Sequence, residues 1–205
     1  MKTLNNFLET TEYNWFRTQY VEDGKYTTAI EYIVENKPKF IVEYGGGKST
    51  LLLTELVNYL DYGGKVVGYE NDEHWYNFSL KKGWNKYNNI KLIDIVEDTY
   101  QPDENYHKAR GVRYVHPIED IEGVDFVIID GPHLLSFPTG PNTTFNLKDI
   151  VNHLGYEVPY FIDGRSGTRD FYSNDLSYKT DIGDEKERWY IIGVMFLHIS
   201  NHLMN

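Results

Sequence analysis

Three consecutive glycines between two apolar segments are the sharpest chemical signal in this sequence. The segment reads IVEYGGGKSTLLL, and the acid Glu43 stands two residues before the first glycine. A glycine-rich turn between a buried strand and a helix lets the backbone come close to a phosphate or a nucleotide. Two kinds of site use such a turn, and the flanking residues distinguish them.

The first kind is the P-loop of nucleoside triphosphatases, which has the pattern G-x-x-x-x-G-K-[ST]. Gly47, Lys48 and Ser49 match the end of this pattern, but the leading glycine would fall at position 42, where the sequence has Val42. Without that glycine the loop is too short to wrap phosphates with backbone N–H groups. A P-loop NTPase therefore remains an alternative, although the sequence lacks the first glycine of that motif.

The second kind begins with an acid and continues with glycines at alternate positions, as Glu43, Gly45 and Gly47 do. On these residues the chain resembles the class I S-adenosylmethionine-dependent methyltransferases, over roughly residues 40–171. The resemblance implies that the acid closes the first strand and that the glycines admit the methionine part of the cofactor. Ser49 stands where the family has a third small residue, and it can cap the following helix.

A second acid, Glu70, ends the next predicted strand, residues 65–70. A carboxylate at this point can accept hydrogen bonds from both hydroxyls of a ribose. A dinucleotide site of the G-x-G-x-x-G type would also place an acid nearby, but its third glycine would fall at Thr50. The pattern therefore favours a nucleoside cofactor over a nicotinamide or flavin dinucleotide.

The resemblance implies further cofactor contacts after the second and third strands. Asn71, Asp72, His74 and Trp75 would flank the adenine, and Trp75 could stack on a purine or pack as the buried face of a helix. Glu97 and Asp98 would reach the adenine amino group, or lie in a solvent-facing loop. The predicted cofactor-binding residues are Glu43, Gly45, Gly46, Gly47, Ser49, Glu70, Asn71, Trp75, Glu97 and Asp98.

The catalytic prediction rests on the apolar segment DFVIID, which ends in Asp130 and is followed by Gly-Pro-His. Ligands of parallel α/β sheets bind outside the carboxyl ends of the strands, so Asp130 is predicted to border the acceptor. Asp130 or His133 would take the acceptor's proton, and these two are the predicted catalytic residues.

A second rim acid, Asp163, ends the following strand and is predicted to lie beside Asp130. Two carboxylates could hold Mg²⁺, but a turn cap or an arginine partner explains Asp163 as well, and no metal is predicted. Arg165 and Arg169 are four residues apart and could grip an anionic group of the acceptor or neutralise the chain's own acids. The predicted acceptor-binding residues are Asp163, Arg165 and Arg169.

The elements that must position these residues alternate between short apolar runs and helix-like stretches, which is typical of βαβ units. The predicted strands are residues 39–43, 65–70, 90–96, 125–130 and 158–163, with two closing strands at 178–183 and 189–199. The predicted helices are residues 27–36, 49–62, 72–84, 146–154 and 169–176. The predicted fold is one α/β domain, Rossmann-like, with a mainly parallel sheet flanked by helices; the resemblance adds a closing antiparallel strand near the C-terminus. Residues 1–37 are predicted as an N-terminal helical segment and residues 97–123 as an insertion or lid.

Composition narrows the function classes. The 205 residues carry a formal charge of −11 and no cysteine, which argues against general nucleic-acid binding and excludes thiol chemistry. No apolar run is long enough to span a membrane, and the N-terminus lacks a secretory pattern, so a cytoplasmic location is predicted. The predicted function is methyl transfer from S-adenosylmethionine to a hydroxyl or amine of a small molecule or glycan. A non-catalytic cofactor-binding module of the same fold is the main alternative, and the oligomeric state is left open.

Overall fold

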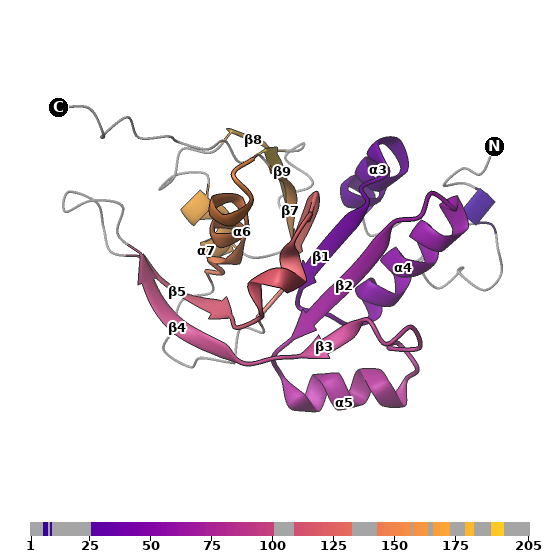
Figure 1. The fold of residues 1–205 in the computed structure, drawn as a ribbon, viewed down its shortest axis with the longest axis horizontal. Helices are drawn as coiled ribbons and strands as arrows, with labels where there is room; N and C mark the ends of the chain where they lie inside the picture. Colours follow the sequence, from indigo (N-terminus) through magenta and orange to yellow (C-terminus); the bar gives the residue numbers. More distant parts are fainter. Residues whose placement is uncertain are drawn as a thin grey trace.

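A seven-stranded sheet, in the order β3-β2-β1-β6-β7-β9-β8, forms the centre of the chain (Figure 1). The computed structural model describes residues 6–7, 9, 26–100, 109–132, 143–156, 158–163, 166–172, 179–182 and 190–194. The strands of this sheet are β1 Phe40–Tyr44, β2 Lys65–Glu70, β3 Ile90–Leu92, β6 Phe126–Ile129, β7 Pro159–Asp163, β8 Lys179–Ile182 and β9 Tyr190–Val194. The first five in the sheet order run parallel. The last pairings, β7 with β9 and β9 with β8, are antiparallel.

The strand order reverses between β1 and β6. From β1 the chain moves outward through β2 to β3 and then returns to β6 and β7 on the other side of β1. In doubly wound folds, ligands bind at the carboxyl ends of the strands where the order reverses. The predicted Rossmann-like class is confirmed, and β9 is the predicted closing antiparallel strand.

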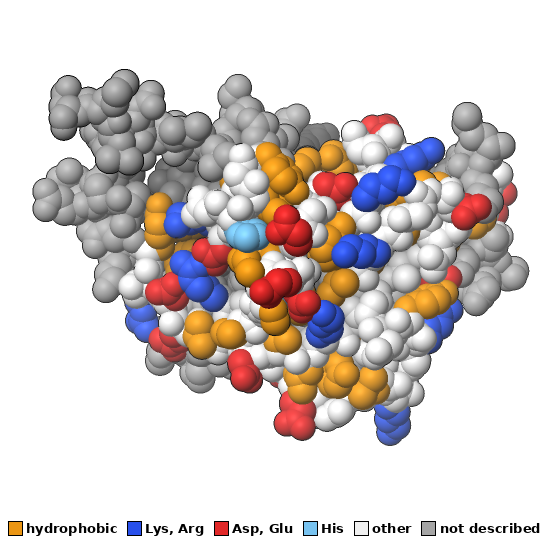
Figure 2. All heavy atoms as spheres, in the orientation of Figure 1, with side chains coloured by type: hydrophobic (Ala, Val, Ile, Leu, Met, Phe, Trp, Pro, Cys, Tyr) orange, Lys and Arg blue, Asp and Glu red, His pale blue; other side chains and the backbone are white. Residues whose placement is uncertain are grey.

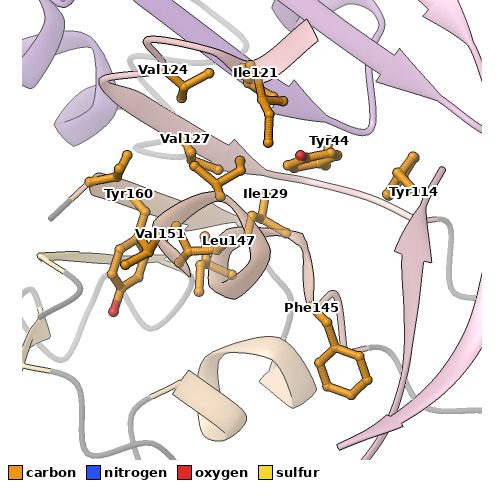
Figure 3. Packing of buried hydrophobic residues seen from close by; sticks show 14 of the residues in the cluster. Tyr44, Tyr114, Ile121, Val124, Val127, Ile129, Phe145, Leu147, Val151 and Tyr160 are labelled. Carbon is orange, nitrogen blue, oxygen red and sulfur yellow. The ribbon is translucent and has the colours of Figure 1, made fainter. Parts of the chain in front are cut away.

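Helices cover both faces of the sheet (Figure 1). They are α3 Thr27–Asn36, α4 Lys48–Leu60, α5 Glu73–Lys81, α6 Asn146–Leu154 and α7 Ser166–Asp170, with a 3₁₀ turn, η3, at Ile118–Ile121. Alternate residues of each strand face opposite sides. Ile41 therefore packs with α3 and α4 in one core cluster, whereas Val42 lies in the other cluster with residues of α6 and with Phe171 and Tyr172, which follow α7. Figure 3 shows the second cluster, which includes Ile129 of β6 and Leu147 of α6.

Helix ends follow local capping. Asp72 caps α5, because its carboxylate accepts a hydrogen bond from the Trp75 N–H at 2.9 Å. The helix predicted over residues 49–62 ends earlier, at Leu60, because the left-handed cap residue is Asp61, with φ 54°, and its N–H bonds to the Val57 carbonyl. The predicted bounds of α3, β2 and α6 agree with the structure.

The predicted strand 90–96 is two strands. β3 ends at Leu92, and β4, Ile95–Tyr100, pairs with β5, Ala109–Tyr114, in a separate antiparallel sheet. Alternating apolar and polar residues suit either sheet, so the sequence pattern does not show where the chain leaves the first one. β5 is anchored to the body by Asn146, whose side-chain amide bonds to both backbone groups of Tyr114. The described part of the stretch predicted as an insertion or lid is thus this hairpin, followed by η3.

Charged side chains are interspersed over the described part of the face in Figure 2, where acidic and basic groups alternate with apolar ones. None of the helices in the described residues combines the length and the apolar character needed to cross a membrane.

Candidate functional site

A pocket of about 390 Å³ lies at the carboxyl ends of β1, β2 and β6. Its described lining residues are Gly45, Glu70, Asp72, His74, Trp75, Asp130 and Gly131. The fold thus joins three segments that are far apart in the sequence: the glycine turn, the end of β2 and the end of β6. This is the position at which doubly wound sheets bind their ligands.

The backbone N–H groups of the glycine turn are all used within the protein. Those of Gly45 and Gly46 donate to the Tyr69 carbonyl at 2.8 and 2.9 Å, and that of Gly47 donates to the Thr50 hydroxyl at 2.9 Å. A P-loop needs such groups to point at phosphate oxygens. The geometry therefore argues against the P-loop alternative.

Two of the glycines permit close packing of backbone against backbone. Gly45 has φ +97°, and a Cβ there would lie 2.5 Å from the Gly131 nitrogen. A Cβ on Gly46 would lie 3.0 Å from the carbonyl carbon of Gly68 in β2. The absence of a side chain at these two glycines therefore allows the ends of β1, β2 and β6 to pack closely around the pocket. This structural role is separate from admitting a ligand.

Gly45→Ala should lower the free energy of unfolding by about 3 kcal/mol, the sum of a positive-φ penalty and a backbone overlap. In a chain of this length that corresponds to a fall in Tm of roughly 6–12 °C, measured by circular dichroism. Gly63→Ala is the matched control, because Gly63 also has positive φ but a Cβ there meets nothing within 4 Å. It should cost only about 1 kcal/mol. Equal losses in the two variants would contradict the close approach at Gly45.

Glu43 lies beneath the glycine turn rather than in the pocket wall. It is fully buried, and its carboxylate accepts hydrogen bonds from the Thr50 hydroxyl and, at 3.1 Å, from the Tyr26 hydroxyl. Burial raises the pKa of Glu43 to about 7, against the opposing effect of hydrogen bonds from Ser49, Thr50 and Tyr26. In the structure Glu43 therefore braces the turn and the start of α4.

Glu70 lies in the pocket wall and is held in one orientation. Its Oε1 accepts hydrogen bonds from the N–H groups of Asn71 and Asp72, both at 2.8 Å. Within the described part of the chain, Oε2 accepts no hydrogen bond. The side chain is buried, and this burial raises the pKa of Glu70 to about 7. One carboxylate oxygen is thus fixed by the backbone while the other is available to a ligand.

Asp130 also lines the pocket. Its N–H donates to the Tyr44 carbonyl at 2.7 Å, and its carboxylate accepts a hydrogen bond from Tyr26 at 3.2 Å. Asp163 ends the neighbouring strand β7, where Ile162 is in register with Ile129. The register brings the two acids to one rim, but Asp163 is not part of the described pocket lining, and the described residues hold no group of three acids or histidines suited to a metal.

Trp75 forms one wall of the pocket from α5. Its ring stacks on Phe78 at 5.3 Å with 18° between the planes, and 44% of the residue is exposed. Of the two roles considered for Trp75, packing as the buried face of the helix is wrong, because the side chain is exposed. It packs on Phe78 of its own helix and lines the pocket, and stacking on a purine stays a prediction. Asn71 follows Glu70 and accepts a hydrogen bond from the Tyr114 hydroxyl at 3.3 Å.

Glu97 and Asp98 are not brought to the pocket. Because β3 ends at Leu92, both lie on β4 of the hairpin and pair with arginines of β5, Glu97 with Arg110 at 3.4 Å and Asp98 with Arg113. The Arg113 guanidinium, which also pairs with an acid of α6, holds the pKa of Asp98 below its usual value. In the structure these two acids bind the hairpin strands together.

Three other predicted residues are not among the described residues of the site. Arg169 of α7 pairs with Asp170 at 3.2 Å and is not part of the pocket lining. His133 and Arg165 lie outside the described residues.

Sequence reasoning missed two tyrosines at the site. Tyr26 contacts both Glu43 and Asp130, and the Tyr114 hydroxyl lies 2.1 Å from where a Cβ on Gly131 would stand. Neither belongs to a motif. Tyr26 precedes a helix and Tyr114 lies in the hairpin, so only contacts between distant segments reveal them.

Neither a family model nor a curated protein matches this sequence. Among solved structures, a Staphylococcus aureus protein described as a candidate caffeoyl-CoA O-methyltransferase has a TM-score of 0.50 and 12% identity, with 93% of this chain and 95% of that chain covered. A methyltransferase from Aquifex aeolicus that depends on S-adenosylmethionine has a TM-score of 0.42 and 13% identity, over 82% and 89% of the two chains. An O-methyltransferase from Bacillus cereus in complex with S-adenosylhomocysteine has a TM-score of 0.43 and 14% identity, over 87% and 82%. The first likeness shows that this chain has a Rossmann-like methyltransferase fold.

Proposed function

We propose that this chain binds S-adenosylmethionine in the pocket and transfers its methyl group to a hydroxyl or amine of a small molecule or glycan. The observation that carries the proposal is Glu70. Its carboxylate is buried at the end of β2, beside the glycine turn, and one of its oxygens is left for a ligand. That arrangement suits the two hydroxyls of a ribose, each of which donates one hydrogen bond.

The rest of the pocket fits a nucleoside without a phosphate chain. The amide groups of the glycine turn are occupied, so the turn offers no phosphate cradle. Trp75 supplies an aromatic surface for a purine, and Gly45 supplies a wall without a side chain. The described lining residues include three acids and neither lysine nor arginine. This charge favours a neutral or cationic acceptor over a phosphorylated one.

The chemistry asked of the protein is modest. S-adenosylmethionine supplies an already reactive methyl group on a sulfonium, so the residues mainly align the acceptor and remove its proton. In the proposed in-line displacement, the acceptor oxygen or nitrogen forms a bond to the methyl carbon as the carbon–sulfur bond breaks. Asp130 takes the proton, and S-adenosylhomocysteine leaves. His133 is the second candidate for the proton.

Ligand-induced stabilisation tests the proposal. S-adenosylhomocysteine at a hundred times its Kd should stabilise the fold by about 2.7 kcal/mol, which raises Tm by roughly 5–11 °C. Mg-ATP and NAD at matched concentrations should leave Tm unchanged, because the pocket lacks a phosphate cradle. A shift with Mg-ATP but none with S-adenosylhomocysteine would overturn the assignment. Formation of S-adenosylhomocysteine during a screen of small hydroxyl and amine compounds then separates an enzyme from a binding module.

A further inference from the structure

The hydroxyl of Tyr26 lies between two carboxylates of the site. Tyr26 stands directly before α3, is 1% exposed, and packs its ring against Phe161 of β7 at 5.4 Å. From there its oxygen reaches Glu43 Oε1 at 3.1 Å and Asp130 Oδ2 at 3.2 Å. Tyr26, which belongs to no motif, thus contacts both Glu43 beneath the glycine turn and Asp130 in the pocket wall.

These contacts belong to a continuous chain of hydrogen bonds. The Gly47 N–H donates to the Thr50 hydroxyl, which donates to Glu43. Tyr26 then contributes one hydroxyl proton to two acceptors, Glu43 and Asp130, so each carboxylate receives a share of a single donor. The chain runs without a break from the glycine turn to the acid that borders the pocket.

The surroundings keep Tyr26 a donor. Acids face its hydroxyl from three strands, Glu43 from β1, Asp130 from the end of β6 and Asp163 from β7, and the Ser49 hydroxyl approaches from α4. Burial and these three acids raise the pKa of Tyr26 well above its ordinary value, so the phenol stays protonated. Glu70 of β2 also faces Asp130. A hydrogen bond from the Tyr26 hydroxyl stabilises the ionised form of the carboxylate that accepts it, so Tyr26 affects which of these acids holds a proton.

We propose that Tyr26 is a positioning residue that fixes the Asp130 carboxylate at the pocket and divides one hydroxyl proton between Asp130 and Glu43. The segment before α3 thereby contributes to a site whose described lining comes from the glycine turn, the ends of β2 and β6 and the start of α5. The inference rests on the proposed function for its catalytic meaning, because a fixed, ionised Asp130 is what proton removal from an acceptor requires. Its structural content can be tested without turnover.

The test is a carboxyl titration by NMR of protein labelled with ¹³C in aspartate and glutamate, with Asp130→Asn and Glu43→Gln used to assign the two signals. Tyr26→Phe keeps the buried ring and removes the donor. The titration midpoints of Asp130 and Glu43 should each rise by roughly 0.5–1 pH unit, because a hydrogen bond to the ionised form is lost. Tyr32→Phe is the matched control, since Tyr32 lies on α3, the helix that Tyr26 precedes, and stacks on Phe126 instead. It should leave both midpoints unchanged.

A second variant tests the same idea without removing the hydroxyl. Replacing Tyr26 by 3-fluorotyrosine makes the phenol a stronger donor, so both midpoints should fall. Unchanged midpoints in folded Tyr26→Phe, or in the fluorotyrosine protein should Tyr26→Phe not fold, would overturn the proposal. Calorimetry with S-adenosylhomocysteine on the unaltered protein is run alongside. Absence of binding there would end the proposed function, while the titration would still decide the role of Tyr26.

Discussion

Glu70→Ala should weaken the binding of S-adenosylhomocysteine by roughly ten- to a hundredfold. The two ribose hydroxyls would lose a charged acceptor, and a hydrogen bond to a charged group is worth about 1.5–3 kcal/mol. Losing part of the two ribose hydrogen bonds is enough for a ten- to hundredfold loss of affinity, since about 1.4 kcal/mol is a factor of ten. Isothermal titration calorimetry measures the change, after Tm has shown that the variant is folded.

Glu73→Ala is the matched control for Glu70. It removes an acid three residues along the chain, in the first turn of α5, where the side chain is exposed and does not line the pocket. Its affinity for S-adenosylhomocysteine should stay within about twofold of the unaltered protein, as surface changes away from a site usually do. Near-identical affinities for both variants would remove the ribose role of Glu70.

The same carboxyl should make binding depend on pH. Burial raises the pKa of free Glu70 to about 7, and ribose hydroxyls that donate to the ionised form would lower it in the complex. Binding therefore favours the deprotonated protein and releases protons near pH 7. Affinity should rise by up to about tenfold from pH 6 to pH 8 and then level off. Calorimetry in buffers of different ionisation enthalpy measures the released protons, and Glu70→Gln should remove this part of the slope.

Asp130→Asn should lower the rate of methyl transfer by about 10²- to 10⁴-fold, the range associated with loss of a general base. The affinity for S-adenosylhomocysteine should change far less, because the asparagine keeps the volume of the side chain and can still accept a hydrogen bond from Tyr26. The measurement is single-turnover formation of S-adenosylhomocysteine with an acceptor found by screening, compared with calorimetry on the same preparation.

Two other outcomes for Asp130→Asn have distinct meanings. Equal losses in rate and in affinity would indicate that the site has collapsed, and an unchanged rate would remove Asp130 from the mechanism. Glu119→Gln controls for the loss of one acid, since Glu119 is exposed in η3. It should leave both quantities unchanged within about twofold.

The main strands and helices of the fold can be predicted from local residue patterns. Strands β1, β2 and β6 are short runs of β-branched and aromatic residues, and helices α3 and α6 repeat apolar residues on one face. Such patterns depend on neighbours in the chain, so their class and several of their ends could be predicted. The glycine turn, Glu70 and the end of β6 were recognisable because strand ends in a parallel sheet must share one rim.

The second sheet, which the chain enters after β3, could not be predicted in the same way. Residues 90–96 read as one strand, yet β3 ends at Leu92 because the chain then enters a second sheet. Partner choice in a β-sheet depends on hydrogen bonds with distant strands, here between β4 and β5, and an alternating pattern is the same for either partner. Because the chain leaves the first sheet after β3, Glu97 and Asp98 lie away from the pocket and form ion pairs with the arginines of β5.

A Rossmann-like sheet, its glycine turn and the acids Glu70 and Asp130 at two strand ends could be predicted from the sequence, because each depends on residues that are close in the chain. The folded chain is needed to see what the glycines pack against, that Glu43 lies beneath the turn, and that Tyr26 joins Glu43 to Asp130. Tyr26 and Asp130 are 104 residues apart. Contacts over such distances depend on how whole elements pack, and no local spacing records them.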